Sequence, residues 1–181
     1  MNPFDPVIRV FAGWGDILSG KPSWRERFDL TGRGIVLALA AYFLVYLLIL
    51  MVQSGLAGRL PSLPEVILSF ALAGGRVVAL GLAIVLTRVT LRFEAPVAAL
   101  LVPSIYALAM LLVLQLLLSL FGTQLASALY GAIGYMLYRV ARVTAGLGIG
   151  PSVAFAALSL VLLVGLPLGL YMLLQSGTGP I

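Results

Sequence analysis

The sequence predicts an all-α, polytopic integral membrane protein with five transmembrane helices and an N-terminal amphipathic interfacial helix. Of the 181 residues, 62% are hydrophobic and 9% are charged, whereas about a quarter of the residues in soluble domains are charged. Five apolar runs have about the length with which a helix crosses a bilayer. Of the 11 basic residues, all except Arg76 lie in short polar segments beside these runs. A bilayer is therefore the expected solvent.

Residues 1–33 are predicted to form a cytoplasmic interfacial segment. Its apolar residues recur at helical spacing, whereas Asp5, Arg9 and Asp16 fall largely on the other side. This pattern is typical of a helix that lies in the plane of the membrane surface. The segment has no continuous apolar core of the kind that a secretory signal contains, so we expect no cleavage there.

A second helix is predicted to start at Ser23, because Ser23 and Glu26 have the spacing of a capping box. We expect the aromatic and basic residues of the N-terminal segment to contact lipid headgroups or a protein partner: Phe4, Phe11, Trp14, Lys21, Trp24, Arg25 and Arg27. Two interpretations stay open, namely a simple membrane anchor and a docking surface for a partner.

The transmembrane domain is predicted over residues 34–175, with a short external tail at 176–181. Its five spans cover about residues 35–52, 66–87, 95–121, 125–143 and 153–174. Pro103 predicts a kink in the third span, because proline removes one helical hydrogen bond. The fourth span is the least apolar, so we expect it to need protein neighbours on one face. Whether the second span is continuous through Gly74 and Gly75 stays open.

The lysine and arginine residues predict the orientation. The N-terminal segment has five, the first loop one, the second loop two, the third loop none, the fourth loop two and the tail none. Because cytoplasmic segments carry the excess of basic residues, we expect a cytoplasmic N-terminus and an external or periplasmic C-terminus in a bacterial plasma (inner) membrane. The same cations favour anionic lipids on the cytoplasmic side. Their scatter beside apolar runs predicts no binding of nucleic acid.

The residue types argue against catalysis. The chain contains no cysteine and no histidine, which excludes thiolate nucleophiles, imidazole acid–base chemistry and Cys or His metal ligands. All six acidic residues lie outside the predicted spans, so no pair of carboxylates is expected inside the bundle. We predict a non-enzymatic protein without a metal or another cofactor.

Arg76 is the main candidate for a binding site. An arginine at mid-bilayer costs at least about 2.5 kcal/mol on insertion scales, so we expect it to face the bundle interior. Without an intramembrane carboxylate, it is available to a lipid phosphate or a substrate carboxylate. The candidate anion-binding residues are Arg76, Gln115, Tyr106, Tyr130 and Tyr135. The alternative is a snorkelling arginine, or one in an aqueous notch, that water and backbone carbonyls satisfy without a ligand.

Other polar and small residues have two interpretations each. Tyr42 and Tyr46 of the first span, with the tyrosines of the fourth, either line a polar cavity or pack between helices and at the membrane surface. We expect small residues to allow close helix packing at Gly131, Gly134, Gly165 and Gly169, with a homodimer face as the alternative.

The segment 9–24, which contains Lys21 and Pro22 and ends in Trp24, resembles the region before the first span in bacterial Yip1-like membrane proteins. The five closely spaced spans and the near absence of an extramembrane domain are also similar to that family. The resemblance implies an architecture more than an activity. The Asp-Leu-Tyr and Tyr-Gly-Pro signatures of the eukaryotic relatives are not found in the spans, so their role in vesicle trafficking is not carried over.

These observations favour a non-enzymatic protein that organises or scaffolds membrane components or lipids. One alternative is a small transporter or lipid-handling protein that binds an anion at Arg76. Another is an accessory subunit of a larger membrane complex, with a membrane-protein partner.

Overall fold

The structure is a computed structural model that describes residues 5–92, 94–119 and 126–176. These residues form seven α-helices and no strand. The helices are α1 (Asp5–Ser19), α2 (Trp24–Arg27), α3 (Gly32–Leu56), α4 (Leu63–Leu91), α5 (Val97–Ser119), α6 (Ala126–Thr144) and α7 (Ile149–Ser176).

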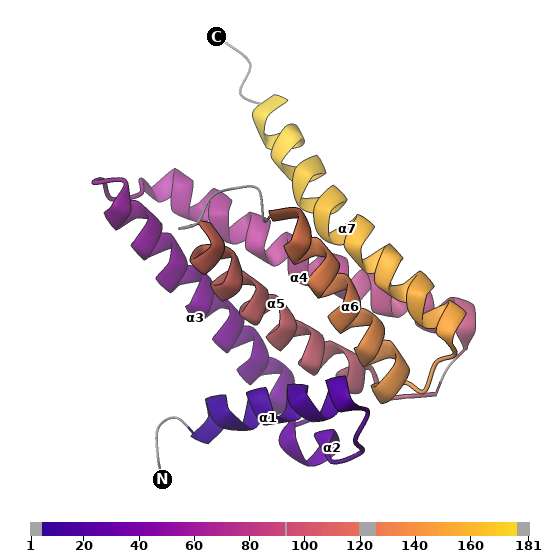
Figure 1. Cartoon of the computed structure of the whole chain (residues 1–181). Coiled ribbons are helices and arrows are strands. Elements are labelled where there is room, and N and C mark those ends of the chain that lie inside the picture. Colours follow the sequence, from indigo (N-terminus) through magenta and orange to yellow (C-terminus); the bar gives the residue numbers. More distant parts are fainter. Residues whose placement is uncertain (1–4, 93, 120–125, 177–181) are drawn as a thin grey trace.

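The five long helices run in alternating directions, so the start of α3 and the end of α7 lie at opposite ends of the bundle (Figure 1). Helix α3 packs mainly on α5, α4 packs mainly on α7, and α6 packs on both α5 and α7. The consecutive helices α3 and α4 touch little, and aromatic side chains connect them. The Phe70 ring stacks on Phe43 at 5.9 Å between centroids and meets Tyr46 edge-on at 5.8 Å.

By length and composition, four helical segments of the described chain are able to cross a membrane: Gly32–Leu56, Leu63–Leu91, Val97–Leu118 and Ile149–Leu173. This confirms the membrane-helical fold class. Helix α6 is not among the four, and its 19 residues include three tyrosines and the arginines Arg139 and Arg142. A fifth crossing by α6 therefore stays a prediction.

Helix α4 is continuous through Gly74 and Gly75, which answers the question that the sequence leaves open. It begins with a capping box, in which the Ser62 N–H donates to Glu65 Oε2 at 2.7 Å and the Glu65 N–H donates to Ser62 Oγ at 3.4 Å. The capping box predicted at Ser23 is wrong. Ser23 has helical dihedral angles and makes no side-chain cap, because the chain is already turning through a hydrogen bond from the Glu26 N–H to the Ser23 carbonyl.

The start of α3 is held by a short hydrogen-bond relay. The Thr31 hydroxyl donates to Asp29 Oδ1 at 2.6 Å and the Thr31 N–H donates to the same oxygen at 3.0 Å. These two hydrogen bonds lower the pKa of Asp29. The Thr31 oxygen in turn accepts from the Gly34 N–H at 3.4 Å, which satisfies one of the free donors at the helix N-terminus.

Gly34→Ala is expected to lower the free energy of unfolding by about 1–2 kcal/mol. A Cβ at Gly34 would overlap the Asp29 carbonyl, which is backbone and cannot move without disturbing this relay. Gly32→Ala is the matched control, since nothing lies within 4 Å of a Cβ at that position. Thermal unfolding of both variants in mild detergent measures the difference. Equal stability of the two variants would show that the backbone relaxes without cost.

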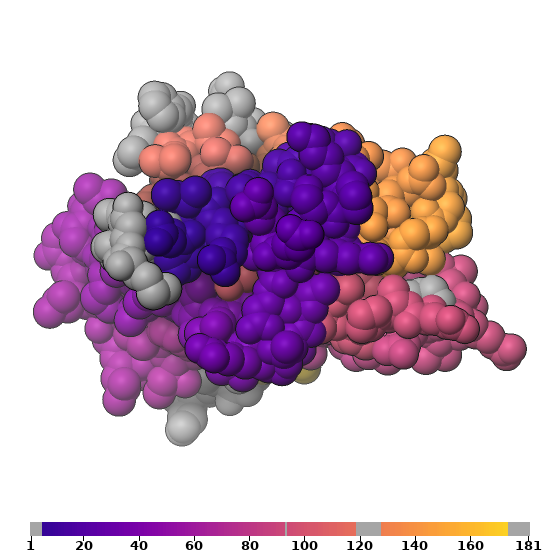
Figure 2. Space-filling model, turned by 90° about the horizontal axis from the view of Figure 1, so that it is seen from below, coloured from indigo at the N-terminus to yellow at the C-terminus, as the bar shows by residue number. Residues whose placement is uncertain are grey.

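Helices α1 and α2 form a cap over one end of the bundle (Figures 1 and 2). Trp14 and Ile17 of α1 are buried, with Trp24 and Phe28. The Arg139 guanidinium of α6 fastens the cap, because its Nη2 donates to the Leu18 carbonyl at 2.7 Å and to the Ile17 carbonyl at 3.0 Å. The carbonyls at the end of a helix lack intrahelical donors, so Arg139 satisfies them and complements the negative end of the helix dipole.

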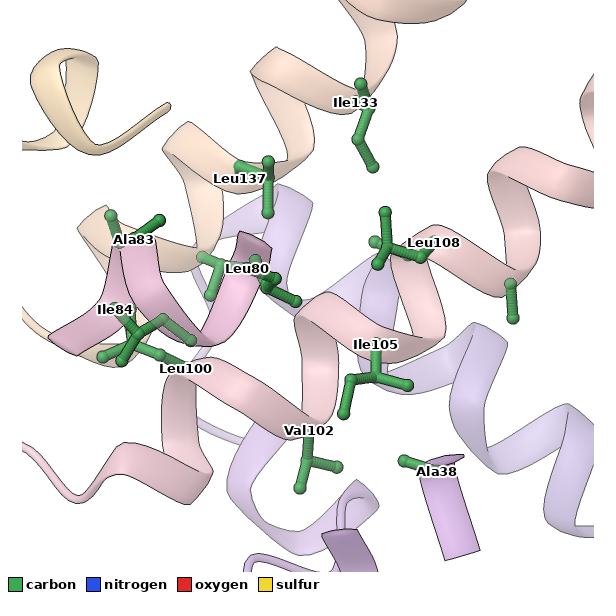
Figure 3. Close-up of a cluster of buried hydrophobic side chains, with 14 of the residues drawn as sticks. Ala38, Leu80, Ala83, Ile84, Leu100, Val102, Ile105, Leu108, Ile133 and Leu137 are labelled. Carbon is green, nitrogen blue, oxygen red and sulfur yellow. The ribbon is translucent and has the colours of Figure 1, made fainter. Parts of the chain in front are cut away.

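The best-packed part of the core lies between this cap and the middle of the bundle. Figure 3 shows side chains of several helices meeting there. Members of this cluster with at most 3% of their surface exposed are Ala38, Leu80, Ala83, Ile84, Leu100, Val102, Ile105, Leu108, Ile133 and Leu137. All of these side chains are aliphatic, and the buried hydroxyl of Ser104 lies beside them in the sequence of α5.

Candidate functional site

Arg76 lies near the middle of α4 and lines two neighbouring cavities. Both cavities are also lined by Leu112 and Gln115 of α5. The side chain of Arg76 is therefore located at the junction of the two spaces, inside the bundle, as the cost of exposing a guanidinium to lipid requires. We call this junction the Arg76 site.

The first cavity has a volume of about 160 Å³ and is lined by all five long helices. Four of its lining residues are polar: Tyr42, Arg76, Gln115 and Tyr130. The others are apolar: Leu108, Leu111, Leu112, Leu129, Ile133, Leu160, Leu163, Val164 and Pro167. We call it the apolar cavity.

The second cavity has a volume of about 180 Å³ and lies between α3, α4 and α5. Half of its eight lining residues are polar: Tyr46, Gln53, Arg76 and Gln115. The rest are Ile49, Leu50, Leu112 and Leu116. We call it the polar cavity.

The Arg76 site carries a positive charge without a carboxylate partner among the described residues. The ion pairs of that part of the chain join Arg27 to Asp16 at 3.7 Å and Arg59 to Glu65 at 2.9 Å. The Arg76 guanidinium lies within interaction range of the phenol of Tyr42. The Tyr42 hydroxyl donates to the Ala73 carbonyl at 3.2 Å, which leaves its oxygen lone pairs to face a donor.

Pro167 lies inside α7, in the part of the helix that lines the apolar cavity. Proline has no N–H, so the carbonyl four residues earlier, that of Leu163, loses its usual helical donor. Both Leu163 and Pro167 line the cavity. Freed carbonyls of this kind are tolerated in membrane helices where polar groups or water satisfy them. The residues that line the two cavities thus include a cation, amide groups and phenol groups.

Both cavities lie on the side of the bundle away from the cap. Their lining residues on α3, α5 and α7 are at the middle of the helix or in the half farther from α1, and those on α6 are near its start. Toward α1 the centre is filled by the aliphatic cluster of Figure 3. Access to Arg76 from water or lipid is therefore expected from one side of the membrane.

Three of the five predicted anion-binding residues, Arg76, Gln115 and Tyr130, meet at the apolar cavity. Tyr106 lies elsewhere, with its ring 6.0 Å from that of Phe28 near the cap. Tyr135 stacks on Tyr138 at 6.3 Å and lines neither cavity.

Gln53 is not among the predicted site residues, and the sequence does not decide whether Tyr42 and Tyr46 line a cavity or pack between helices. These three residues are spaced by four and seven positions, which places them on one face of a helix. That face of α3 lines the two cavities. The spacing was thus a usable signal, although Gln53 lies just beyond the apolar run.

The predicted packing glycines are placed unequally. A Cβ at Gly134 would lie 2.8 Å from Cδ1 of Leu160, so α6 and α7 approach closely there. Nothing lies within 4 Å of a Cβ at Gly131, Gly165 or Gly169.

The predicted lipid-contact residues also divide. Phe11, Lys21, Arg25 and Arg27 are exposed, and Arg25 lies over the Trp24 ring at 5.6 Å. Trp14 and Trp24 are 3% and 2% exposed, so packing inside the protein, rather than lipid, surrounds them. Phe4 lies outside the described residues.

The chain matches no family model, no curated protein and no solved structure. The resemblance to Yip1-like proteins therefore stays a prediction, and function has to be argued from the Arg76 site itself.

Proposed function

We propose that this protein is a non-enzymatic membrane protein that binds an anionic ligand at Arg76 and handles lipids or other anions within the bilayer. The observation that carries the proposal is the junction of two cavities at an intramembrane arginine with no carboxylate partner among the described residues. A guanidinium presents five donors in a planar fork that suits phosphate and carboxylate. The lining contains no carboxylate, imidazole or thiol, which favours binding over chemical conversion.

The proposal includes five membrane crossings, with α6 as the fourth. Two observations support this: α6 packs along α5 and α7, and it continues the alternation of direction seen in Figure 1. Tyr130 of α6 lines the apolar cavity, and Arg139 donates a hydrogen bond to the cap. Tyr135 and Tyr138 stack on each other. A helix with protein neighbours does not need the apolarity of a helix surrounded by lipid.

We further propose that α1 lies in the cytoplasmic interface of a bacterial inner membrane. Val7, Ile8, Phe11 and Leu18 are 52%, 60%, 61% and 41% exposed, and their spacing gathers them on one side of the helix. Trp14 and Ile17 on an adjacent face pack into the cap. Such an arrangement suits a helix that contacts protein on one face and the acyl boundary on another.

Arg76→Gln is expected to weaken anion binding at least tenfold, because it removes the charge while keeping a shorter polar side chain. The measurement is retention of anionic lipids by the purified protein in neutral detergent, followed by native mass spectrometry. Arg88→Gln is the control for the loss of one basic residue at the predicted membrane surface, since Arg88 lies on the same helix but lines neither cavity. Equal lipid retention by the two variants would remove Arg76 from the function.

A further inference from the structure

We infer that the two cavities form one binding site for an amphiphile. The anionic group of the ligand lies at Arg76, the polar atoms next to that group lie in the polar cavity, and the hydrocarbon chain lies in the apolar cavity. This inference rests on the proposed anion binding and adds the ligand class. The shared chemistry is an anionic head, phosphate or carboxylate, on a hydrocarbon chain.

The two cavities differ in the polarity of their walls. Nine of the thirteen residues that line the apolar cavity are aliphatic or proline, compared with four of the eight that line the polar cavity. Arg76, Leu112 and Gln115 belong to both walls, so a ligand held at Arg76 reaches either space. An amphiphile, whose polar head and apolar chain are joined at an anionic group, matches this difference between the two cavities.

The apolar cavity is much larger than the space that one water needs. One water needs about 10–15 Å³ of such volume and several polar partners, whereas this cavity has about 160 Å³. Water is poorly held by an aliphatic wall, and a small inorganic anion at Arg76 would leave most of that wall without contacts. A hydrocarbon chain would fill the space and gain its dispersion contacts.

Part of the wall of the apolar cavity is exposed on the surface of the bundle. Tyr130 of α6 and Val164 of α7 line the apolar cavity and are also 50% and 44% exposed on the surface of the bundle. The wall that these two residues form is therefore accessible from outside the bundle. On the side toward the cap, Gly134 and Leu160 bring the same helices together. A chain is expected to enter sideways from the leaflet opposite the cap, while its head stays near the level of Arg76.

The test uses the full chain in a neutral maltoside detergent and three probes: inorganic phosphate, monoalkyl phosphates of four to twelve carbons, and fatty acids of the same lengths. Burial of one methylene corresponds to about a fourfold gain in affinity. We expect affinity to rise with chain length by up to that factor per methylene until the cavity is full. Because detergent micelles also absorb longer chains, the gain in affinity is measured relative to Val164→Trp, in which the entrance of the apolar cavity is filled.

Val164→Trp should occupy the entrance of the apolar cavity and abolish the dependence of affinity on chain length. The matched control is Val161→Trp, because Val161 lies on the same helix, is 67% exposed and lines neither cavity. Tighter binding of alkyl phosphates identifies a phospholipid source, and tighter binding of fatty acids identifies a carboxylate source. Either result supports the inference.

Arg76-dependent binding of inorganic phosphate without any gain from a chain would overturn the amphiphile site and leave the proposed anion binding intact. Failure of all three probes to bind would overturn both. A second measurement is independent of the tryptophan variant. An alkyl phosphate with a photoreactive group at its chain end should label α6 and α7, and labelling of α3 alone would contradict the assignment of the chain to the apolar cavity.

Discussion

Replacing Arg76 by leucine is expected to raise the free energy of unfolding by about 2–3 kcal/mol and to abolish anion binding. The guanidinium is held inside a membrane domain without a carboxylate partner among the described residues, so its burial is compensated mainly by neutral groups such as Tyr42. Leucine removes that cost and suits the aliphatic wall of the apolar cavity. A residue that lowers stability and is kept at a cavity is typical of a functional site.

Two further variants separate charge from shape. Arg76→Lys keeps the charge but loses the planar fork, so we expect about tenfold weaker binding of phosphate or carboxylate and no gain in stability. Arg88→Leu, at the exposed end of the same helix, should change stability by about 0.5 kcal/mol or less. Unfolding is measured by denaturant titration in mixed micelles. If Arg76→Leu destabilises the protein, Arg76 is a structural residue and the binding proposal loses its basis.

The sequence identifies Arg76 because its signal is local. It is the one charged residue in the middle of a predicted span, and the energetic cost of its position does not depend on which helices surround it. Its neighbours are a different matter. Gln115 and Tyr130 meet Arg76 while Tyr106 and Tyr135 do not, because the rotation of each helix and the order of the helices in the bundle decide which faces converge. Periodicity within one helix contains no information on that order.

Helix α6 shows a second limit of the sequence. Its tyrosines and arginines make it too polar to qualify as a span by composition, yet it packs between α5 and α7. The sequence predicts that this segment needs protein neighbours, and the contacts agree. What the sequence does not show is that Arg139 reaches residues more than a hundred positions away in α1. Arg139, which is one of the basic residues that predict the orientation, therefore also connects α6 to α1.

The two tryptophans illustrate the same difficulty at the N-terminus. An aromatic residue near basic residues is typical of the membrane interface, and the helical spacing of Trp14 is compatible with either of two faces. The structure buries Trp14 and Trp24 in the cap and leaves Val7, Ile8 and Phe11 exposed. Helix α1 therefore has apolar side chains on two faces, one packed inside the protein and one exposed, and a hydrophobic pattern does not distinguish them.

Arg139→Ala is expected to detach the cap from the bundle. The variant loses two hydrogen bonds from a charged donor to the carbonyls of Ile17 and Leu18, together worth about 3 kcal/mol. Trp14 and Trp24 are the only tryptophans of the chain, and both lie in the cap, so their fluorescence reports its opening without a label. We expect a shift of emission to longer wavelength, faster quenching by iodide and about a hundredfold faster amide exchange in α1.

Arg142→Ala is the matched control for this release. Its Nη1 donates to the Leu147 carbonyl at 3.0 Å in the turn before α7, so it supports the same end of the bundle without contacting α1. Its removal should leave tryptophan emission unchanged. If Arg139→Ala also leaves emission and exchange unchanged, the buried faces of Trp14 and Ile17 hold the cap without the arginine. If instead the cap is released and anion binding is unaltered, the Arg76 site works independently of the cap, as expected for cavities on the side of the bundle away from it.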